Sequence, residues 1–185
     1  MDQDHQPSPG PMRPRIGRLS LVFVAAVAVG LASAFLGGGA EAEQTPEAAE
    51  REAAPAVVFD AFDGSTWRLG DHLETDGRPV VLNLWASWCP PCREEIPEIS
   101  AFADAHPEVF VVGVAVDDRL EDAAELAAEL QPRYLVGFDT SGMVRAHYPS
   151  FGLPVTYVID EEGRIARTLD GIVDQERLEE ALEDI

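Results

Sequence analysis

Short apolar runs and helical apolar patterns alternate along the chain from Pro55 to its carboxy terminus. A continuous apolar or β-branched run is typical of a buried strand, whereas apolar residues spaced three or four positions apart indicate a helix with one buried face. These patterns predict strands at Val57–Phe62, Thr66–Leu69, Val80–Trp85, Val109–Val116, Tyr134–Phe138, Val155–Ile159 and Ile165–Leu169. They predict helices at Cys92–Ala105, Leu120–Leu130, Ser141–His147 and Gln175–Leu182.

The order of these segments predicts the fold class. Strands that alternate with helices are typical of an α/β domain, which has parallel strand pairs in a central sheet and helices on both faces. Asp63-Gly64 lies between the first two strands and is a strong hairpin signal. The last two strands flank a turn at residues 160–163 and add an antiparallel pair. We therefore expect one folded domain at residues 55–185 with a mixed central sheet.

A long apolar segment precedes this domain. Leu19–Leu36 is a run of 18 residues without a charge, and roughly 20 apolar residues span the hydrocarbon core of a membrane as a helix. Arg13, Arg15 and Arg18 precede the segment, so the positive-inside rule places the amino terminus in the cytoplasm. The sequence thus predicts a disordered cytoplasmic tail at 1–18, a single-pass signal-anchor helix at 19–39 and a flexible acidic linker at 40–54.

A cleaved secretory signal is the competing interpretation of the same segment, although its apolar region is usually about 7–15 residues long. Ala32-Ser33-Ala34 or Ala40-Glu41-Ala42 would supply the small residues for cleavage. A buried core helix fits poorly, because the segment has no polar face. Both the membrane anchor and the cleaved signal place the folded domain outside the cytoplasm, where disulfides persist.

The charge of the chain restricts its partners. There are 34 Asp and Glu residues against 13 basic residues, which are all Arg, and the formal net charge is -21. Such a chain repels phosphates, so we do not expect a nucleic-acid partner, and it favours basic partners. The absence of Lys agrees with compositional drift and with adaptation to high salt, and the sequence leaves both interpretations open.

The two cysteines of the chain, Cys89 and Cys92, lie at the predicted boundary between a strand and a helix. Free amides at the start of a helix stabilise an anion, so this position predicts a lowered thiol pKa and a nucleophilic role for Cys89. Cys92 comes one turn later and can attack a mixed disulfide at Cys89 to release the partner. Pro90 and Pro91 suit the first helical turn and stiffen the loop between the cysteines.

Three further roles for the cysteine pair agree less well with the sequence. A zinc site usually has four ligands, and His72, His106 and His147 lack the paired spacing that would complete one. Covalent haem attachment requires His directly after the second cysteine, where this chain has Arg93. Inert buried cysteines are the third of these roles. We expect a redox-active disulfide between the two cysteines, without a metal or another cofactor.

Two stretches carry a resemblance to a known family. VVLNLWASWCPPCREEIPEI, residues 80–99, resembles the active-site segment of thioredoxin-fold proteins of the TlpA/ResA type, and GLPVTYVIDEEGRI, residues 152–165, resembles their cis-proline segment. The likeness covers residues 55–185. It implies a thioredoxin fold with an amino-terminal β-hairpin and an inserted βα unit. It also implies a membrane-tethered or secreted thiol–disulfide oxidoreductase, and many proteins of this type reduce apocytochrome c thiols before haem attachment.

The resemblance also implies roles for individual residues. Cys89 matches the attacking cysteine and Cys92 the resolving one. Pro154 matches the cis-proline that lies against both, and Leu153 before it offers extended backbone to a substrate. The same comparison places Trp88, Pro90 and Pro91 on the substrate-binding surface.

Glu95 matches a family glutamate that helps to manage the proton of the resolving thiol. Its alternative interpretation is a solvated residue in the first helical turn, where the helix dipole favours an acid. Asn83 stands where ordinary thioredoxins have a buried Asp that moves protons, and Asn cannot titrate. Val155 follows the cis-proline where Thr is frequent, which removes one polar contact.

The predicted function is the reduction of protein disulfides, with apocytochrome c as a candidate substrate. A reductase outside the cytoplasm needs electrons, which the resemblance assigns to a membrane donor of the DsbD/CcdA type. A thiol peroxidase of the peroxiredoxin type is an alternative, but those enzymes place Thr three residues before the reactive cysteine, where this chain has Ala86. The sequence also leaves open a general disulfide oxidant and a scaffolding domain without enzymatic activity.

Overall fold

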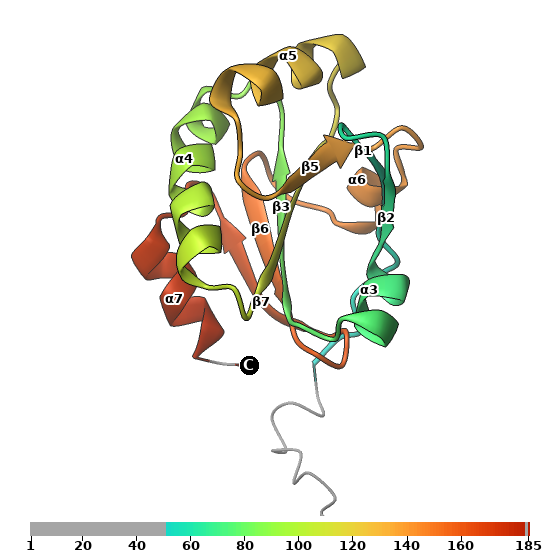
Figure 1. Ribbon diagram of the computed structural model, residues 1–185, viewed down its shortest axis with the longest axis vertical. Coiled ribbons are helices and arrows are strands. Elements are labelled where there is room, and N and C mark those ends of the chain that lie inside the picture. Colours follow the sequence, from blue (N-terminus) through green and yellow to red (C-terminus); the bar gives the residue numbers. More distant parts are fainter. Residues whose placement is uncertain (1–50, 184) are drawn as a thin grey trace, which may run out of the picture. The chain divides into compact units, whose positions relative to one another are not determined.

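The computed structural model describes residues 51–183 and 185, which form one α/β unit (Figure 1). The predicted cytoplasmic tail, the signal-anchor helix and residues 40–50 of the predicted linker lie outside the described residues. Within the described part of the chain, no helix combines the length and the apolar character that crossing a membrane requires.

A seven-stranded mixed sheet forms the centre of the described unit. Its strands are β1 (Val58–Ala61), β2 (Thr66–Arg68), β3 (Val80–Trp85), β4 (Phe110–Ala115), β5 (Leu135–Phe138), β6 (Val155–Ile159) and β7 (Ile165–Asp170). Their order across the sheet is β2-β1-β5-β4-β3-β6-β7. The pairs β3–β4 and β4–β5 are parallel, and the other neighbouring pairs are antiparallel. The predicted mixed sheet with an amino-terminal hairpin is therefore confirmed.

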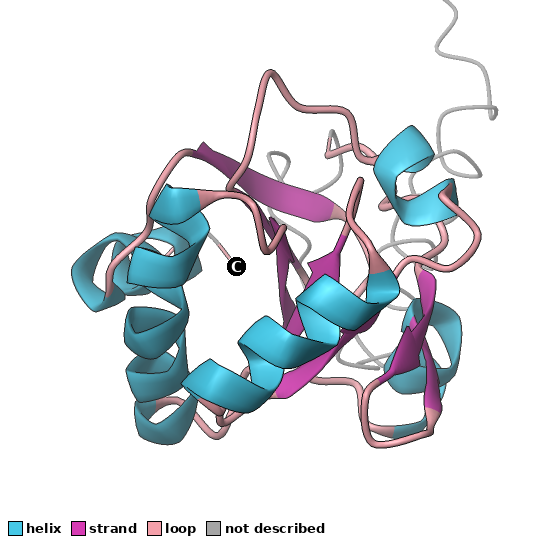
Figure 2. Cartoon of the chain, turned by 90° about the horizontal axis from the view of Figure 1, so that it is seen from above, coloured by secondary structure: helices cyan, strands magenta, loops and turns pink. Residues whose placement is uncertain are grey.

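Helices cover both faces of this sheet (Figure 2). They are α3 (Leu69–Thr75), α4 (Pro90–Ala105), α5 (Leu120–Leu130), α6 (Met143–His147) and α7 (Gln175–Leu182). Along the chain, β5 and α6 come after the β3–α4–β4 unit and α5 and before the final β6–β7 hairpin, in agreement with the predicted insertion. Helix α3 was not predicted, because its seven residues bury only Leu69 and His72 and so carry too few apolar positions for a periodic signal.

Strand β3 holds the two layers together, because all six of its residues are buried. Successive side chains of a strand point to opposite faces. Leu82 and Leu84 accordingly join the apolar cluster that includes Val144 of α6. Val81 joins the cluster on the other face, which includes Phe102 of α4 and residues of α7. The continuous apolar run in the sequence therefore reflects burial from both sides.

The folded part begins slightly earlier than predicted. The N–H of Ala54 donates to the carbonyl of Gly163 over 2.8 Å, and the N–H of Ile165 donates to the carbonyl of Glu52 over 2.8 Å. These bonds attach residues 52–54 to the β6–β7 hairpin, although the sequence assigned them to the flexible linker. Their composition is that of a linker, and only pairing with a distant strand gives them a fixed position.

Gly137 of β5 lies close to the backbone of β1 and supports a test of the pairing between these two strands. It pairs with Ala61 of β1, and an added Cβ would lie 2.7 Å from the Ala61 Cα and closer still to the Asp60 carbonyl. We expect Gly137→Ala to lower the free energy of unfolding by about 3 kcal/mol, since rigid backbone would have to move. Gly70→Ala is the control, because nothing lies within 4 Å there. It should change stability by less than about 1 kcal/mol in urea unfolding, and equal effects would contradict the described strand spacing.

Candidate active site

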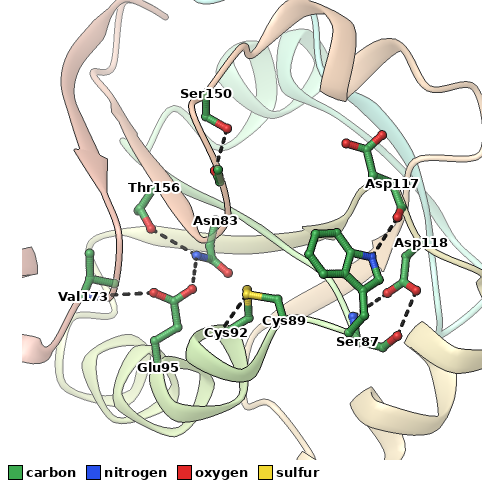
Figure 3. The surroundings of a disulfide bond; sticks show 12 residues. Asn83, Ser87, Cys89, Cys92, Glu95, Asp117, Asp118, Ser150, Thr156 and Val173 are labelled. Carbon is green, nitrogen blue, oxygen red and sulfur yellow. Dashed lines mark hydrogen bonds between the residues drawn. A yellow bond between two sulfur atoms is a disulfide. The ribbon is translucent and has the colours of Figure 1, made fainter.

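Cys89 and Cys92 form a disulfide where β3 leads into α4 (Figure 3). Cys89 is the N-cap of α4, and its Sγ accepts a hydrogen bond from the Cys92 N–H over 3.3 Å. The helix begins at Pro90, two residues before the predicted start. Proline suits this position because its missing N–H would have no helical partner. Both cysteines are buried, and Cys89 retains 2% of its exposure.

A second loop holds the residues that precede Cys89. The Oγ of Ser87 donates to Oδ1 of Asp118 over 2.8 Å, and the Ser87 N–H donates to the other oxygen of that carboxylate. The indole Nε1–H of Trp88 donates to the carbonyl of Asp117 over 2.9 Å. Figure 3 shows both aspartates on the same side of the disulfide as Ser87. The loop that follows β4 therefore fixes the approach to the nucleophile.

Asp117 and Asp118 are site residues that were not predicted, although the sequence contains a signal for them. They follow β4 after the single residue Val116, and β4 runs parallel to β3 with Trp85 opposite Ala115. The carboxyl ends of neighbouring parallel strands meet at one edge of a sheet, where α/β proteins place their sites. Two polar residues at the end of β4 are therefore expected to lie beside the end of β3.

The predicted substrate-binding residues differ in exposure. Trp88 is 60% exposed although its indole nitrogen is hydrogen-bonded. Pro90 is exposed, and Pro91 is half-buried. These three side chains lie in sequence around the buried Cys89. A partner that reaches the nucleophile would therefore contact an apolar surface beside it.

The Leu153–Pro154 peptide bond is cis, as the resemblance implied. Pro154 is buried, and its carbonyl accepts a hydrogen bond from the N–H of Gly171 over 3.0 Å. Leu153 is half-buried and packs against the apolar cluster that contains Cys89 and Cys92. The fold thus brings the cis-proline segment and the disulfide together from positions about 60 residues apart in the chain.

Glu95 lies inside the protein, one turn after Cys92 on α4. Its residue exposure is 0%, so the interpretation as a solvated first-turn acid is wrong. The amide Nδ2 of Asn83 donates to Oε1 of Glu95 over 2.8 Å, and the N–H of Val173 donates to Oε2 over 3.2 Å. The same Nδ2 also donates to Oγ1 of Thr156 over 3.1 Å, as Figure 3 shows.

Burial raises the pKa of Glu95 from 4.5 to about 7. The hydrogen bonds from Asn83 and Val173, and the more distant charge of Arg177, act in the opposite direction but do not cancel the loss of solvation. A carboxyl group with this pKa exchanges a proton readily near neutral pH. Asn83 cannot titrate as the buried Asp of ordinary thioredoxins does. It instead donates a hydrogen bond to the Glu95 carboxylate, which titrates near neutral pH.

Fold and site together define a thioredoxin-fold protein with an oxidised Cys-Pro-Pro-Cys pair next to a buried carboxyl group. The chain belongs to the AhpC/TSA family, which matches residues 51–168.

Curated relatives carry thiol–disulfide names. DsbE of Pseudomonas aeruginosa, a thiol:disulfide interchange protein, is 31% identical over 149 residues, which cover 80% of this chain and 81% of DsbE. Sporulation thiol-disulfide oxidoreductase A of Bacillus subtilis is 27% identical over 82% of this chain and 90% of its own. ResA of Bacillus thuringiensis is 29% identical over 71% of this chain and 76% of its own. The predicted resemblance is confirmed.

Solved structures agree with the fold. One from Chlorobium tepidum, whose proposed identity is the thiol:disulfide interchange protein DsbE, has a TM-score of 0.65 and 28% identity and covers 72% of this chain and 94% of its own. StoA from Bacillus subtilis has a TM-score of 0.60 and covers 70% of this chain and 97% of its own. At 24% identity, StoA supports the fold alone.

The raised pKa of Glu95 predicts a dependence of stability on pH. The folded state binds a proton more tightly than the unfolded state, so the stabilisation is complete below pH 4.5 and is lost as pH rises to about 7. We expect the oxidised protein to lose about 3 kcal/mol across this range from Glu95. Glu95→Gln should remove this slope, measured by urea unfolding at several pH values.

The slope is the informative quantity in this experiment, because Gln has one acceptor oxygen in place of two and so weakens the bonds from Asn83 and Val173 at every pH. Glu94→Gln is the matched control, since Glu94 is the exposed neighbour on the same helical turn. It should leave the slope of the wild-type protein unchanged. A Glu95→Gln variant with the wild-type slope would show that Glu95 ionises normally in the folded protein.

Proposed function

We propose that this protein reduces disulfides of other proteins through Cys89 and Cys92. It is a thiol–disulfide oxidoreductase, the class that the names of its relatives give. The single observation that carries the proposal is the Cys89–Cys92 disulfide at the first turn of α4, beside the cis-proline segment. A bond between residues three positions apart contributes no long-range crosslink, so its formation and breakage leave the fold intact.

The reaction follows from this placement. In the reduced protein, the Cys89 thiolate attacks one sulfur of the partner disulfide, whose S–S bond breaks and releases a thiolate. Cys92 loses its proton and attacks the Cys89 sulfur in the mixed disulfide, and the second partner thiolate leaves. Two electrons pass from the cysteine pair to the partner, each partner thiolate takes up one proton, and the Cys89–Cys92 disulfide forms.

Glu95 supports the second step. It lies one turn from Cys92 on the same helix and is the buried acid held by Asn83 and Val173. With a pKa of about 7, a fraction of the carboxyl group is ionised at neutral pH and can accept the Cys92 proton. The Cys92 thiolate then forms inside the protein, where direct proton transfer to water would be slow.

The cellular setting of this proposal comes from the sequence. The apolar segment at Leu19–Leu36 anchors the chain in the cell membrane, and residues 55–185 face the extracytoplasmic side; cleavage and secretion are the alternative. A membrane protein of the DsbD/CcdA type then supplies the electrons that regenerate the dithiol. Apocytochrome c, whose thiols must be reduced before haem attachment, is the proposed substrate.

The peroxidase alternative is not favoured. Ala86 is buried and occupies the position at which peroxiredoxins have Thr, so this chain lacks that side chain for peroxide chemistry.

Single cysteine variants test the assigned roles. We expect Cys92→Ser to accumulate a stable mixed disulfide with a disulfide-containing protein substrate, because Cys89 attacks but no second thiol releases the partner. Cys89→Ser should trap almost none, because Cys92 has no exposed surface and lies inside α4, away from the N-cap position where unpaired helix amides stabilise a thiolate. Non-reducing gel electrophoresis followed by mass spectrometry of the adduct measures both results. Equal trapping by the two variants would refute the assignment of Cys89 as the nucleophile.

The direction of electron flow has its own measurement. Equilibration of the Cys89–Cys92 couple with glutathione or dithiothreitol gives its reduction potential. A reductant should have a value near about -270 mV, as thioredoxin has, whereas about -120 mV is typical of a strong oxidant such as DsbA. A measured potential near about -120 mV would contradict the proposed reductase and indicate a general oxidant.

A further inference from the structure

An apolar side chain stands in solvent immediately before the cis-proline segment. Phe151 has a relative exposure of 108%, so no described residue covers its ring. A Phe side chain can bury about 150–250 Å² on contact with a partner, which makes an uncovered ring a strong contact point. Leu153, two residues later, packs against the cluster that contains both cysteines. The exposed ring therefore stands two residues from a side chain that packs against the active-site cysteines.

The loop that carries Phe151 is fixed by hydrogen bonds on both sides of that residue. The hydroxyl of Tyr157 donates to the carbonyl of Pro149 over 2.8 Å. The Oγ of Ser150 accepts from Nη1 of Arg145 over 3.0 Å and donates to the carbonyl of Gly152 over 2.7 Å. The backbone on both sides of the exposed ring is consequently held in place before any partner binds, which reduces the entropy lost on binding.

A groove of about 390 Å³ lies next to this loop, and its lining consists of Pro149, Ser150, Phe151, Thr168 and Asp170. Thr168 and Asp170 are two positions apart on β7 and therefore point to the same face of that strand. The N–H of Gly171, just after β7, donates to the carbonyl of Pro154. Figure 3 shows Ser150 among the residues that surround the disulfide. The groove therefore lies beside the cis-proline segment, because Asp170 pairs with Val155, the residue that follows Pro154.

The wall of this groove is negatively charged. Asp170 is exposed, and its carboxylate has no ion-pair partner among residues 51–183 and 185. Among the described residues, neither of the two cations near the groove forms an ion pair with this carboxylate. Arg145 forms an ion pair with Asp117 over 2.8 Å, and Arg177 donates to the carbonyls of Asp170 and Ile172. With a chain net charge of -21, a basic ligand is the complementary one.

We propose that this groove binds the cysteine-bearing segment of the substrate protein and selects an apolar residue together with Lys or Arg close to the cysteine. The apolar side chain covers Phe151, and the basic side chain reaches the Asp170 carboxylate. The inference rests on the proposed function, since it names the class of substrate for the same site. Leu153 positions the segment, and the groove supplies the sequence preference.

Synthetic peptides test this preference. Each peptide carries one cysteine in a disulfide with thionitrobenzoate, one Leu, and Arg, Gln or Glu placed in turn at each position within three residues of the cysteine. The reduced protein releases the coloured thiolate, and the rate gives the preference directly. We expect the Arg peptide to react up to about fivefold faster than the Gln peptide at one or two positions, and the Glu peptide to react more slowly than both. The preference should shrink at high ionic strength.

Variants assign the preference to the groove. Asp170→Asn should make the Arg and Gln peptides react at equal rates. Glu161→Gln is the matched control, because it makes the same charge change at the exposed turn of the same hairpin, and it should retain the preference. Phe151→Ser should slow all Leu-containing peptides by at least about fivefold. Val58→Ser, which removes another exposed apolar side chain, should leave these rates unchanged.

Hydroxyethyl disulfide, a small neutral disulfide, distinguishes a failure of the proposed function from a failure of the proposed groove. If the wild-type protein does not react with it, the proposed function fails. If the wild-type protein reacts with it but reacts with all charge variants of the peptide at one rate, the groove does not select a basic residue. If Asp170→Asn keeps the preference for Arg, the selection lies elsewhere on the acidic surface and the assignment to this groove is overturned.

Discussion

The junction between β3 and α4 is the constraint on which the site depends. Strand β3 is buried on both faces and is paired on both edges, with β4 and with β6, so its carboxyl end cannot shift. Helix α4 begins five residues after this strand ends, and Cys89 is its N-cap. The nucleophile therefore occupies the point where helix amides are unpaired, and that position is set by the core of the protein.

Two groups of contacts complete the junction from parts of the chain that lie far away in sequence. The loop after β4 binds Ser87 and Trp88 through Asp117 and Asp118. Leu153 of the cis-proline segment packs against the cluster that contains both cysteines, and the Gly171 N–H joins that segment to the end of β7. A rigid scaffold of this kind holds a reactive sulfur in one orientation, so that binding energy is not spent on ordering the site.

Glu95 shows how a neutral residue can position a titrating one. Asn83 and Thr156 lie opposite each other on β3 and β6, and the Asn83 amide binds both Thr156 and the Glu95 carboxylate. A charged partner would have lowered the pKa of Glu95 strongly, whereas the amide donors leave desolvation as the main effect. The acid is therefore retained inside the protein and titrates near neutral pH.

The sequence by itself determined the strands and helices of the centre, the location of the cysteine pair and the resemblance. Continuous apolar runs and helical spacing depend only on local order, and α5 begins and ends at the predicted residues. Tertiary structure decided which polar residues are buried and which distant segments pair, because neither depends on local sequence pattern. It buried Glu95, which by sequence equally resembled a solvated acid, and it joined residues 52–54 to a distant hairpin. The contacts of Asp117, Asp118 and Asp170 likewise depend on which strands become neighbours, because burial and pairing arise from residues far apart in the chain.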